Sequence, residues 1–170
     1  MATGLLSTTT LPTGFTSPFK RVAMEERIDD ALACIAMVTG NKLADVTAAA
    51  IKLGYPAHGP AWTHYSLIAK LVPKLSTYGS VDYQDLLSVS ALPDLAILLV
   101  NYDPGTEIGR HVLWHHVRAT EKVPSFHYII DPAGWIDAKH HVTSDFNHLN
   151  LKGAYYIELT QPTYAAVKGK

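Results

Sequence analysis

The sequence predicts an α+β domain, with a buried N-terminal helix and further helices packed on a C-terminal antiparallel sheet. Helical patterns follow one another in the first half of the chain, and β-type apolar runs separated by turn signals occupy the second half. The first helical segment is apolar on every face, which is typical of a helix enclosed by the rest of its fold. At 170 residues, 48% of them hydrophobic, the chain has the length and composition of one domain with its own core.

The helical half begins with a segment over residues 29–38. Its acidic start, Asp29 and Asp30, suits a helix N-terminus, and Gly40 supplies a stop. Three further helices are expected over residues 45–53, 62–71 (stopped near Pro73) and 83–89, the last one short.

The β half contains four expected strands, and two of them close on clear turn signals. The sequence Asp103-Pro104-Gly105 follows the first strand, and Asp131-Pro132-Ala133-Gly134 follows the third. The strands are expected over residues 95–100, 111–117, 126–130 and 154–159. We find no internal repeat and no second domain.

The ends of the chain differ in composition from its centre. We expect an extended arm over residues 1–20, a single domain over 21–162 and a short tail over 163–170. The arm is rich in Thr, Ser, Gly and Pro, so it has few apolar groups to offset the entropy of ordering. Two interpretations follow: the arm packs along its own domain, or it docks on a neighbouring subunit of a larger assembly.

Charge and cysteine content narrow the possible partners and location. The formal net charge is −1 with no basic run, which argues against nucleic acid or an anionic membrane surface as the main partner. The apolar stretch over residues 95–100 is too short to span a bilayer. The single cysteine, Cys34, favours a reducing compartment, and residues 1–19 lack the basic start of a signal peptide. We therefore expect a protein that is cytoplasmic where it is synthesised.

A buried helix followed by strands that carry a histidine and then a carboxylate is an arrangement used by cysteine peptidases. A thiol at the helix N-terminus is stabilised as thiolate, the histidine takes its proton, and the carboxylate orients the imidazole. The blocks that fit this order are residues 29–40 (Asp-Asp-Ala-Leu-Ala-Cys-Ile-Ala-Met-Val-Thr-Gly), 109–113 (Gly-Arg-His-Val-Leu) and 128–134 (Tyr-Ile-Ile-Asp-Pro-Ala-Gly).

These three blocks resemble the papain-like peptidases that cleave double-glycine (bacteriocin) leaders. That family typically reads Asp-Cys-Gly-x-Ala-Cys-Leu-Ala-Met in its first helix, then Gly-His-Phe-Val-Val, then Val-x-Asp-Pro-x-x-Gly. The order and spacing agree over about residues 25–135. The resemblance implies a papain-like fold, with His111 at the position of the general base and Asp131 at the carboxylate that orients it.

The nucleophile does not carry over in this resemblance. Cys34 falls on the family's second, non-catalytic cysteine, and Asp30 takes the catalytic position. The family's oxyanion glutamine is also missing, because the only glutamines are Gln84 and Gln161, far from the helix start. The site positions Asp30, His111 and Asp131 are therefore expected to be a vestigial triad.

Two catalytic alternatives remain open. Asp30 is itself a carboxylate and would be the nucleophile in the first. In the second, the helix starts about one turn later, which exposes Cys34 for attack, with His111 as base and Asp131 orienting it. A shift of one residue, placing Ala31 at the nucleophile position, is a further alternative.

The leading functional prediction is a non-catalytic papain-like domain, a pseudoenzyme, that binds a protein or peptide partner. A role in assembly, as a component of a larger particle such as a phage virion, fits the arm. The rival is an active cysteine peptidase. We expect no cofactor and no metal, although His111 and His115 would share a strand face and reach a site with Asp131. Three tryptophans, Trp62, Trp114 and Trp135, are candidates for a groove or for the core.

Overall fold

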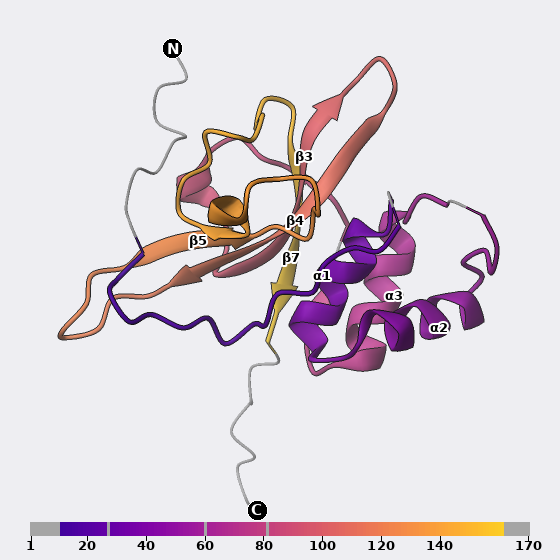
Figure 1. Ribbon diagram of the computed structural model, residues 1–170, viewed down its shortest axis with the longest axis horizontal. Helices are drawn as coiled ribbons and strands as arrows, with labels where there is room; N and C mark the ends of the chain where they lie inside the picture. Colours follow the sequence, from indigo (N-terminus) through magenta and orange to yellow (C-terminus); the bar gives the residue numbers. More distant parts are fainter. Residues whose placement is uncertain (1–10, 27, 60, 81, 162–170) are drawn as a thin grey trace, which may run out of the picture.

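The computed structural model describes residues 11–26, 28–59, 61–80 and 82–161, and in it three helices pack on an antiparallel sheet (Figure 1). The predicted α+β class is confirmed. The helices are α1 (Asp30–Thr39), α2 (Leu43–Lys52) and α3 (Tyr65–Leu75), with short 3₁₀ turns η1 (Val89–Ala91) and η2 (Ala138–His140). The strands are β1 (Gly79–Ser80), β2 (Gln84–Asp85), β3 (Leu95–Asp103), β4 (Ile108–Val117), β5 (Phe126–Ile130), β6 (Val142–Thr143) and β7 (Tyr155–Thr160).

The sheet is built around the hairpin of β3 and β4. Its order is β1-β7-β3-β4-β5-β6, with β2 also paired to β7, and every pairing is antiparallel. β4 extends beyond the pairing with β5, which ends at the Leu113–Ile130 pair. The far end of β4, residues 108–112, therefore has β3 on one side only, and this free end faces the functional site described below.

Helix α1 is the centre of the helical layer. Every residue from Asp30 to Val38 is buried, and the helix contacts β4, α2 and α3. It ends at Gly40, whose φ of 70° is a left-handed cap that glycine adopts without strain. The predicted all-round burial and the predicted stop are both confirmed, with boundaries shifted by one residue.

The two faces of the sheet bury separate apolar clusters, because side chains alternate along each strand. One face meets the helices and includes Leu113 and Ile130. The opposite face includes Val112 and Ile129 and is covered by irregular segments that carry Phe146, among others. This alternation decides which polar side chains at the end of β4 can reach α1.

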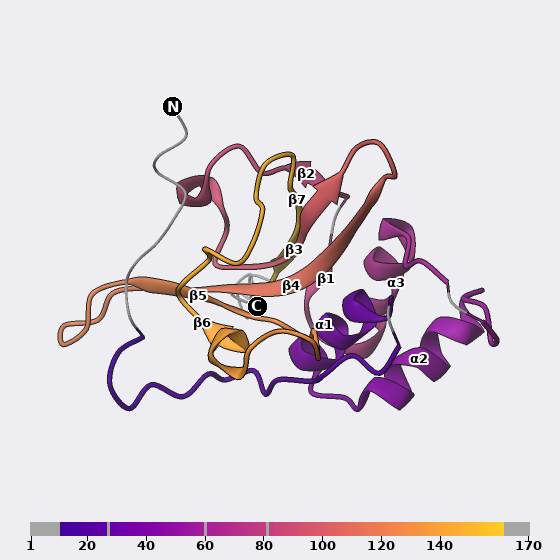
Figure 2. The same ribbon diagram turned by 45° about the horizontal axis from the view of Figure 1, so that its top comes forward.

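Residues 11–20, the described part of the predicted arm, lie along the sheet of their own domain (Figure 2). Phe15 packs edge-on against Phe126 and Tyr128, with ring centroids 4.8 and 5.2 Å apart. The Ser17 hydroxyl lies 2.6 Å from the Tyr128 hydroxyl. Packing along the chain's own domain thus applies to these residues. Residues 1–10 and the tail 163–170 lie outside the described residues, so contact with a neighbouring subunit stays a prediction.

The prediction of a helix over residues 83–89 is wrong. Gln84 and Asp85 form β2 on the edge of β7, and the Leu86 N–H donates to the carbonyl of Ala154. Backbone groups of this segment thus form hydrogen bonds with β7 and Ala154 in place of the hydrogen bonds that a helix would have formed within itself. The third helix also differs from expectation: α3 begins at Tyr65, and Pro73 lies within its last turn.

No single helix among the described residues is long and apolar enough to cross a bilayer. Helices α1 and α2 reach the necessary length and apolar composition only together, as a pair bent by 110°.

The close approach of β3 to Gly109 of β4 generates a prediction about stability. A Cβ at Gly109 would lie 2.8 Å from Leu99 Cδ1 and 2.9 Å from the Val100 carbonyl oxygen. Gly109→Ala should therefore lower the free energy of unfolding by about 2 kcal/mol in urea denaturation. The matched control is Gly134→Ala, where a Cβ meets nothing within 4 Å, and it should change stability by less than about 0.5 kcal/mol. Equal effects of the two substitutions would contradict this packing.

Candidate functional site

The site is built where the N-terminus of α1 meets the free end of β4. Asp30, the first residue of α1, accepts hydrogen bonds at Oδ2 from both the backbone N–H and the ring Nδ1 of His111, with the ring contact at 2.7 Å. Both residues are buried, with 5% and 7% of their surface exposed. The backbone N–H is available because β5 does not extend this far along β4.

The second ring nitrogen of His111 is also engaged. Tyr83, which precedes β2, places its hydroxyl 2.6 Å from His111 Nε2, with the two rings nearly parallel. Because an ionised carboxylate can only accept, Nδ1 carries the proton donated to Asp30, and the Tyr83 hydroxyl is the hydrogen-bond partner of Nε2. Asp30, His111 and Tyr83 form one continuous hydrogen-bonded chain.

The pKa values of the two flanking groups agree with this assignment of protons. Burial acts to raise the pKa of Asp30, but the hydrogen bonds and charge of His111 outweigh it, and the net pKa is lowered. The carboxyl is therefore ionised at neutral pH. The pKa of Tyr83 is raised strongly, first by burial and then by the negative charge of Asp30, so its hydroxyl stays protonated in its contact with Nε2.

Asp131 does not join this chain. Its buried Oδ1 accepts from Arg110 Nη1 at 2.5 Å and from the Ala133 N–H at 3.0 Å. His148 Nε2 lies 3.5 Å from Oδ2. The resemblance to the leader peptidases implied Asp131 as the group that orients His111, and the structure differs: Tyr83 is the residue at Nε2.

Strand alternation explains the different position of Asp131. His111 and Leu113 face the helices, while Arg110 and Val112 face the other side of the sheet. Ile130 faces the helices, so Asp131, the next residue, continues onto the side of Arg110. Asp131 therefore lies on the side of the sheet that carries Arg110, and it pairs with Arg110 and not with His111.

Cys34 lies one helical turn inside α1 and has no exposed surface. Its pKa is raised well above the ordinary value, first by burial and then by the negative charges of Asp30 and Asp131. The alternative with Cys34 as nucleophile required α1 to start a turn later and the thiol to reach His111. The helix starts at Asp30, and both ring nitrogens of His111 have other partners. Ala31, the off-register alternative, is also fully buried.

The segment before α1 is organised by the other acidic residue of the helix start. Asp29 Oδ2 accepts hydrogen bonds from the backbone N–H groups of Glu25 and Glu26, at 3.2 and 3.0 Å. Burial raises the pKa of Asp29, although these hydrogen bonds oppose that shift. These two main-chain N–H groups before the helix are thus already bound to a carboxylate of the same chain.

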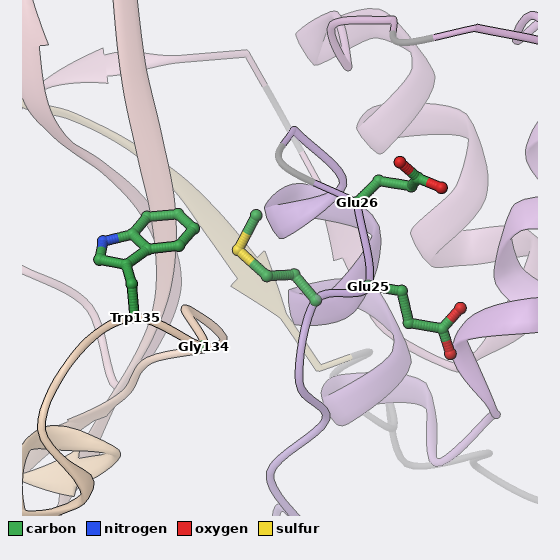
Figure 3. Close-up of a pocket in the computed structure, with 5 residues that line it drawn as sticks. Glu25, Glu26, Gly134 and Trp135 are labelled. Atoms are coloured by element: carbon green, nitrogen blue, oxygen red, sulfur yellow. The ribbon is translucent and has the colours of Figure 1, made fainter.

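Three adjoining pockets form a groove along this site. The first, of about 410 Å³, is lined by residues that include His111, Tyr83 and Trp62. The second, of about 220 Å³, shares Trp62 with the first and adds Trp135. The third, of about 640 Å³, lies between Trp135 on one side and Glu25 and Glu26 on the other (Figure 3). Neighbouring pockets share lining residues, and we call the three pockets together the Trp62–Trp135 groove.

The remaining residues that the sequence suggested for a groove or a metal site lie outside this site. Trp114 is a core residue, 2% exposed, whose Nε1 donates to the carbonyl of Pro93 at 2.8 Å. His115 Nδ1 lies 2.8 Å from the Tyr128 hydroxyl, so it is not part of the site. Among the described residues, no group of three or more His, Cys, Asp or Glu side chains is arranged to hold a metal ion.

Tyr83 is the functional residue that the sequence analysis missed. It falls in the segment wrongly expected to be helical, and the sequence there holds no motif that links it to His111. Its position depends on the pairing of β2 with β7, which is a long-range contact.

Comparison with protein-family models and with curated proteins finds no match to the chain.

The buried Asp30–His111 contact predicts a pH-dependent stability. Asp30→Asn should lower the free energy of unfolding by about 3 kcal/mol at neutral pH, because it removes the charge that His111 pairs with inside the protein. The pKa of Asp30 is depressed in the folded state, so the ionised carboxyl stabilises the fold above its unfolded pKa. That contribution disappears as the pH falls, and the gap between the two proteins should narrow below about pH 4.

Urea denaturation across the acid range measures this gap. Asp85→Asn, at an exposed carboxyl on β2, is the control and should change stability by less than about 0.5 kcal/mol. A gap that stays constant down to the lowest pH would contradict an ionised, His111-bound Asp30.

Proposed function

We propose that the chain is a non-catalytic domain of papain-like peptidase architecture that binds a segment of a protein or peptide in the Trp62–Trp135 groove. Its role would be docking or assembly without turnover of the bound segment. The resemblance of residues 29–40, 109–113 and 128–134 to the leader peptidases is the basis for the papain-like part of this proposal. An α1 whose N-terminus meets a histidine on β4 supports it.

The observation that carries the non-catalytic part is the state of His111. A general base needs a free nitrogen directed at a nucleophile or at a water molecule. Here Nδ1 is bound to Asp30 and Nε2 to Tyr83, with distances of 2.7 and 2.6 Å. Asp30 as a nucleophile is disfavoured by the same geometry, because its Oδ2 accepts two hydrogen bonds from His111.

The distribution of exposed apolar side chains supports the binding part. Five large hydrophobic residues are exposed among the described residues, and three of them, Trp62, Ile108 and Trp135, line the groove. The two tryptophans are 59% and 62% exposed. Clustered exposed apolar side chains mark interaction sites, and tryptophan is enriched among the residues that dominate binding energies.

The rival function is a cysteine hydrolase that uses Cys34. It would require the N-terminal turn of α1 to unwind, the Asp30–His111 contact to break and a fully buried thiol to reach the groove. The two functions differ in one measurable property, which is the reactivity of Cys34 in the folded protein.

Alkylation by iodoacetamide at neutral pH measures that reactivity. We expect Cys34 to remain unlabelled in the folded protein and to react fully only after denaturation, because it is buried and its pKa is raised. Rapid labelling of folded protein that is lost in His111→Ala would overturn the non-catalytic proposal.

The control for this experiment restores a thiol at the position where the leader peptidases carry theirs. In a Cys34→Ala background, Asp30→Cys places the only thiol at the N-terminus of α1, beside His111. Its pKa should fall below the ordinary value, and alkylation at neutral pH should be at least about tenfold faster than in the same variant with His111→Ala. Equal rates in the two variants would show that the site lacks papain-like geometry.

Selection from a phage-displayed random peptide library tests binding. We expect enriched peptides whose affinity falls by at least about tenfold in Trp62→Ala, because truncation of a tryptophan removes a large contact area. Leu87→Ala is the control, since Leu87 is 85% exposed and does not line the groove. Enriched peptides that bind Trp62→Ala and the wild-type protein equally would contradict the groove as binding site.

A further inference from the structure

The charges around the Trp62–Trp135 groove are acidic at both ends. Glu25 and Glu26 line the pocket beside Trp135, and Glu107 lines the pocket beside His111. All three glutamates are exposed, and none forms an ion pair with another described residue. Their negative charges are therefore not neutralised by their described neighbours.

The basic side chains that line the groove already have partners within the protein. Arg110 is the arginine that lines it, and its guanidinium is paired with the buried carboxylate of Asp131 at 2.5 Å. His111 donates to the ionised Asp30. His64, the remaining histidine in the lining, has its Nδ1 2.8 Å from the Ser66 hydroxyl. Among the described residues that line the groove, the charged side chains without an ion-pair partner are those of Glu25, Glu26 and Glu107.

The aromatic side chains that line the groove also favour cationic ligand groups. The exposed faces of Trp62 and Trp135 attract guanidinium and ammonium groups through the negative face of the indole. Figure 3 shows Glu25 and Glu26 across the pocket from Trp135, with their carboxylates directed away from the ring. The glutamates thus supply a negative field at the rim of the groove, while the indoles supply the contact surface.

Glu107, at one end of the groove, has an unusual backbone conformation. It adopts φ = 56°, the left-handed region that glycine or asparagine occupies at lower cost. The turn between β3 and β4 thus carries a glutamate where its conformation favours a smaller residue.

We propose that the occupant of the groove is an extended segment of a partner protein in which arginine or lysine alternates with apolar side chains. This inference rests on the proposed binding function and adds the chemistry of the ligand. Apolar side chains of the segment cover Trp62, Ile108 and Trp135, and its cationic side chains meet the glutamates at the two ends. An acidic segment is repelled by the same charges.

Three short synthetic peptides labelled with fluorescein test the inference by fluorescence anisotropy. In one, leucine alternates with arginine; in the other two, arginine is replaced by serine or by glutamate. We expect the arginine peptide to bind at least about tenfold more tightly than the glutamate peptide at low salt, and this preference to shrink as salt is added. Triple neutralisation of the rim, Glu25→Gln with Glu26→Gln and Glu107→Gln, should reduce the preference to about twofold or less.

Glu121→Gln is the matched control, because Glu121 is exposed in the loop between β4 and β5, outside the groove, and its neutralisation should leave the preference unchanged. Equal affinities for the arginine and glutamate peptides, or a preference that survives the triple neutralisation, would overturn the inference.

The serine peptide separates this inference from the proposed function. Binding of the serine peptide that is weakened by Trp62→Ala supports the groove as a peptide site whatever the charge preference. Failure of all three peptides to bind would count against the proposed function itself.

Discussion

The hydrogen-bonded contact between Asp30 and His111 is the constraint on which the arrangement of helices and sheet depends. Residues 31–38 are all apolar, so Asp30 is the only polar side chain in the buried part of α1. Apolar packing alone specifies the rotation of such a helix weakly, because each face is an acceptable core face. A buried carboxylate has to meet its donors, and both donors belong to His111. The contact therefore fixes the rotation and the height of α1 against β4.

The same contact also determines what the site can do. A thiol next to a histidine is a reactive pair, since the histidine takes its proton and the helix N-terminus stabilises the thiolate. A carboxylate in that position is already ionised and instead holds the Nδ1 proton of His111 in place. Tyr83 engages the remaining nitrogen. The interaction that stabilises the helix–sheet contact thus leaves His111 without a free nitrogen, which is the physical basis of the proposal that the domain binds without cleaving.

Local patterns in the sequence predicted what local physics determines. The apolar stretch after Asp29, the glycine stop at Gly40 and the strand at residues 126–130 were found within a residue of their observed positions. The segment around Tyr83 was missed because it forms β2 only by pairing with β7, about seventy residues later in the chain. Asp131 was placed with the wrong partner because short motifs do not report the strand face, and one residue of alternation sends it to Arg110. The expected approach of Asp30 to His111 is present in the structure, whereas the expected approach of Asp131 to His111 is not.

The groove contains exposed tryptophans that the packing of the core does not require. Trp114 is buried and contributes to the core, as most tryptophans do, whereas Trp62 and Trp135 remain more than half exposed. Exposed indoles contribute little to the free energy of folding, so the fold gives no account of why two of them line one surface beside Asp30 and His111. A chain that kept these residues only for a peptidase reaction would also need a free base and a reactive nucleophile. His111 has no free nitrogen and Cys34 is buried, and contact with a bound segment is therefore the role that we propose for the two tryptophans.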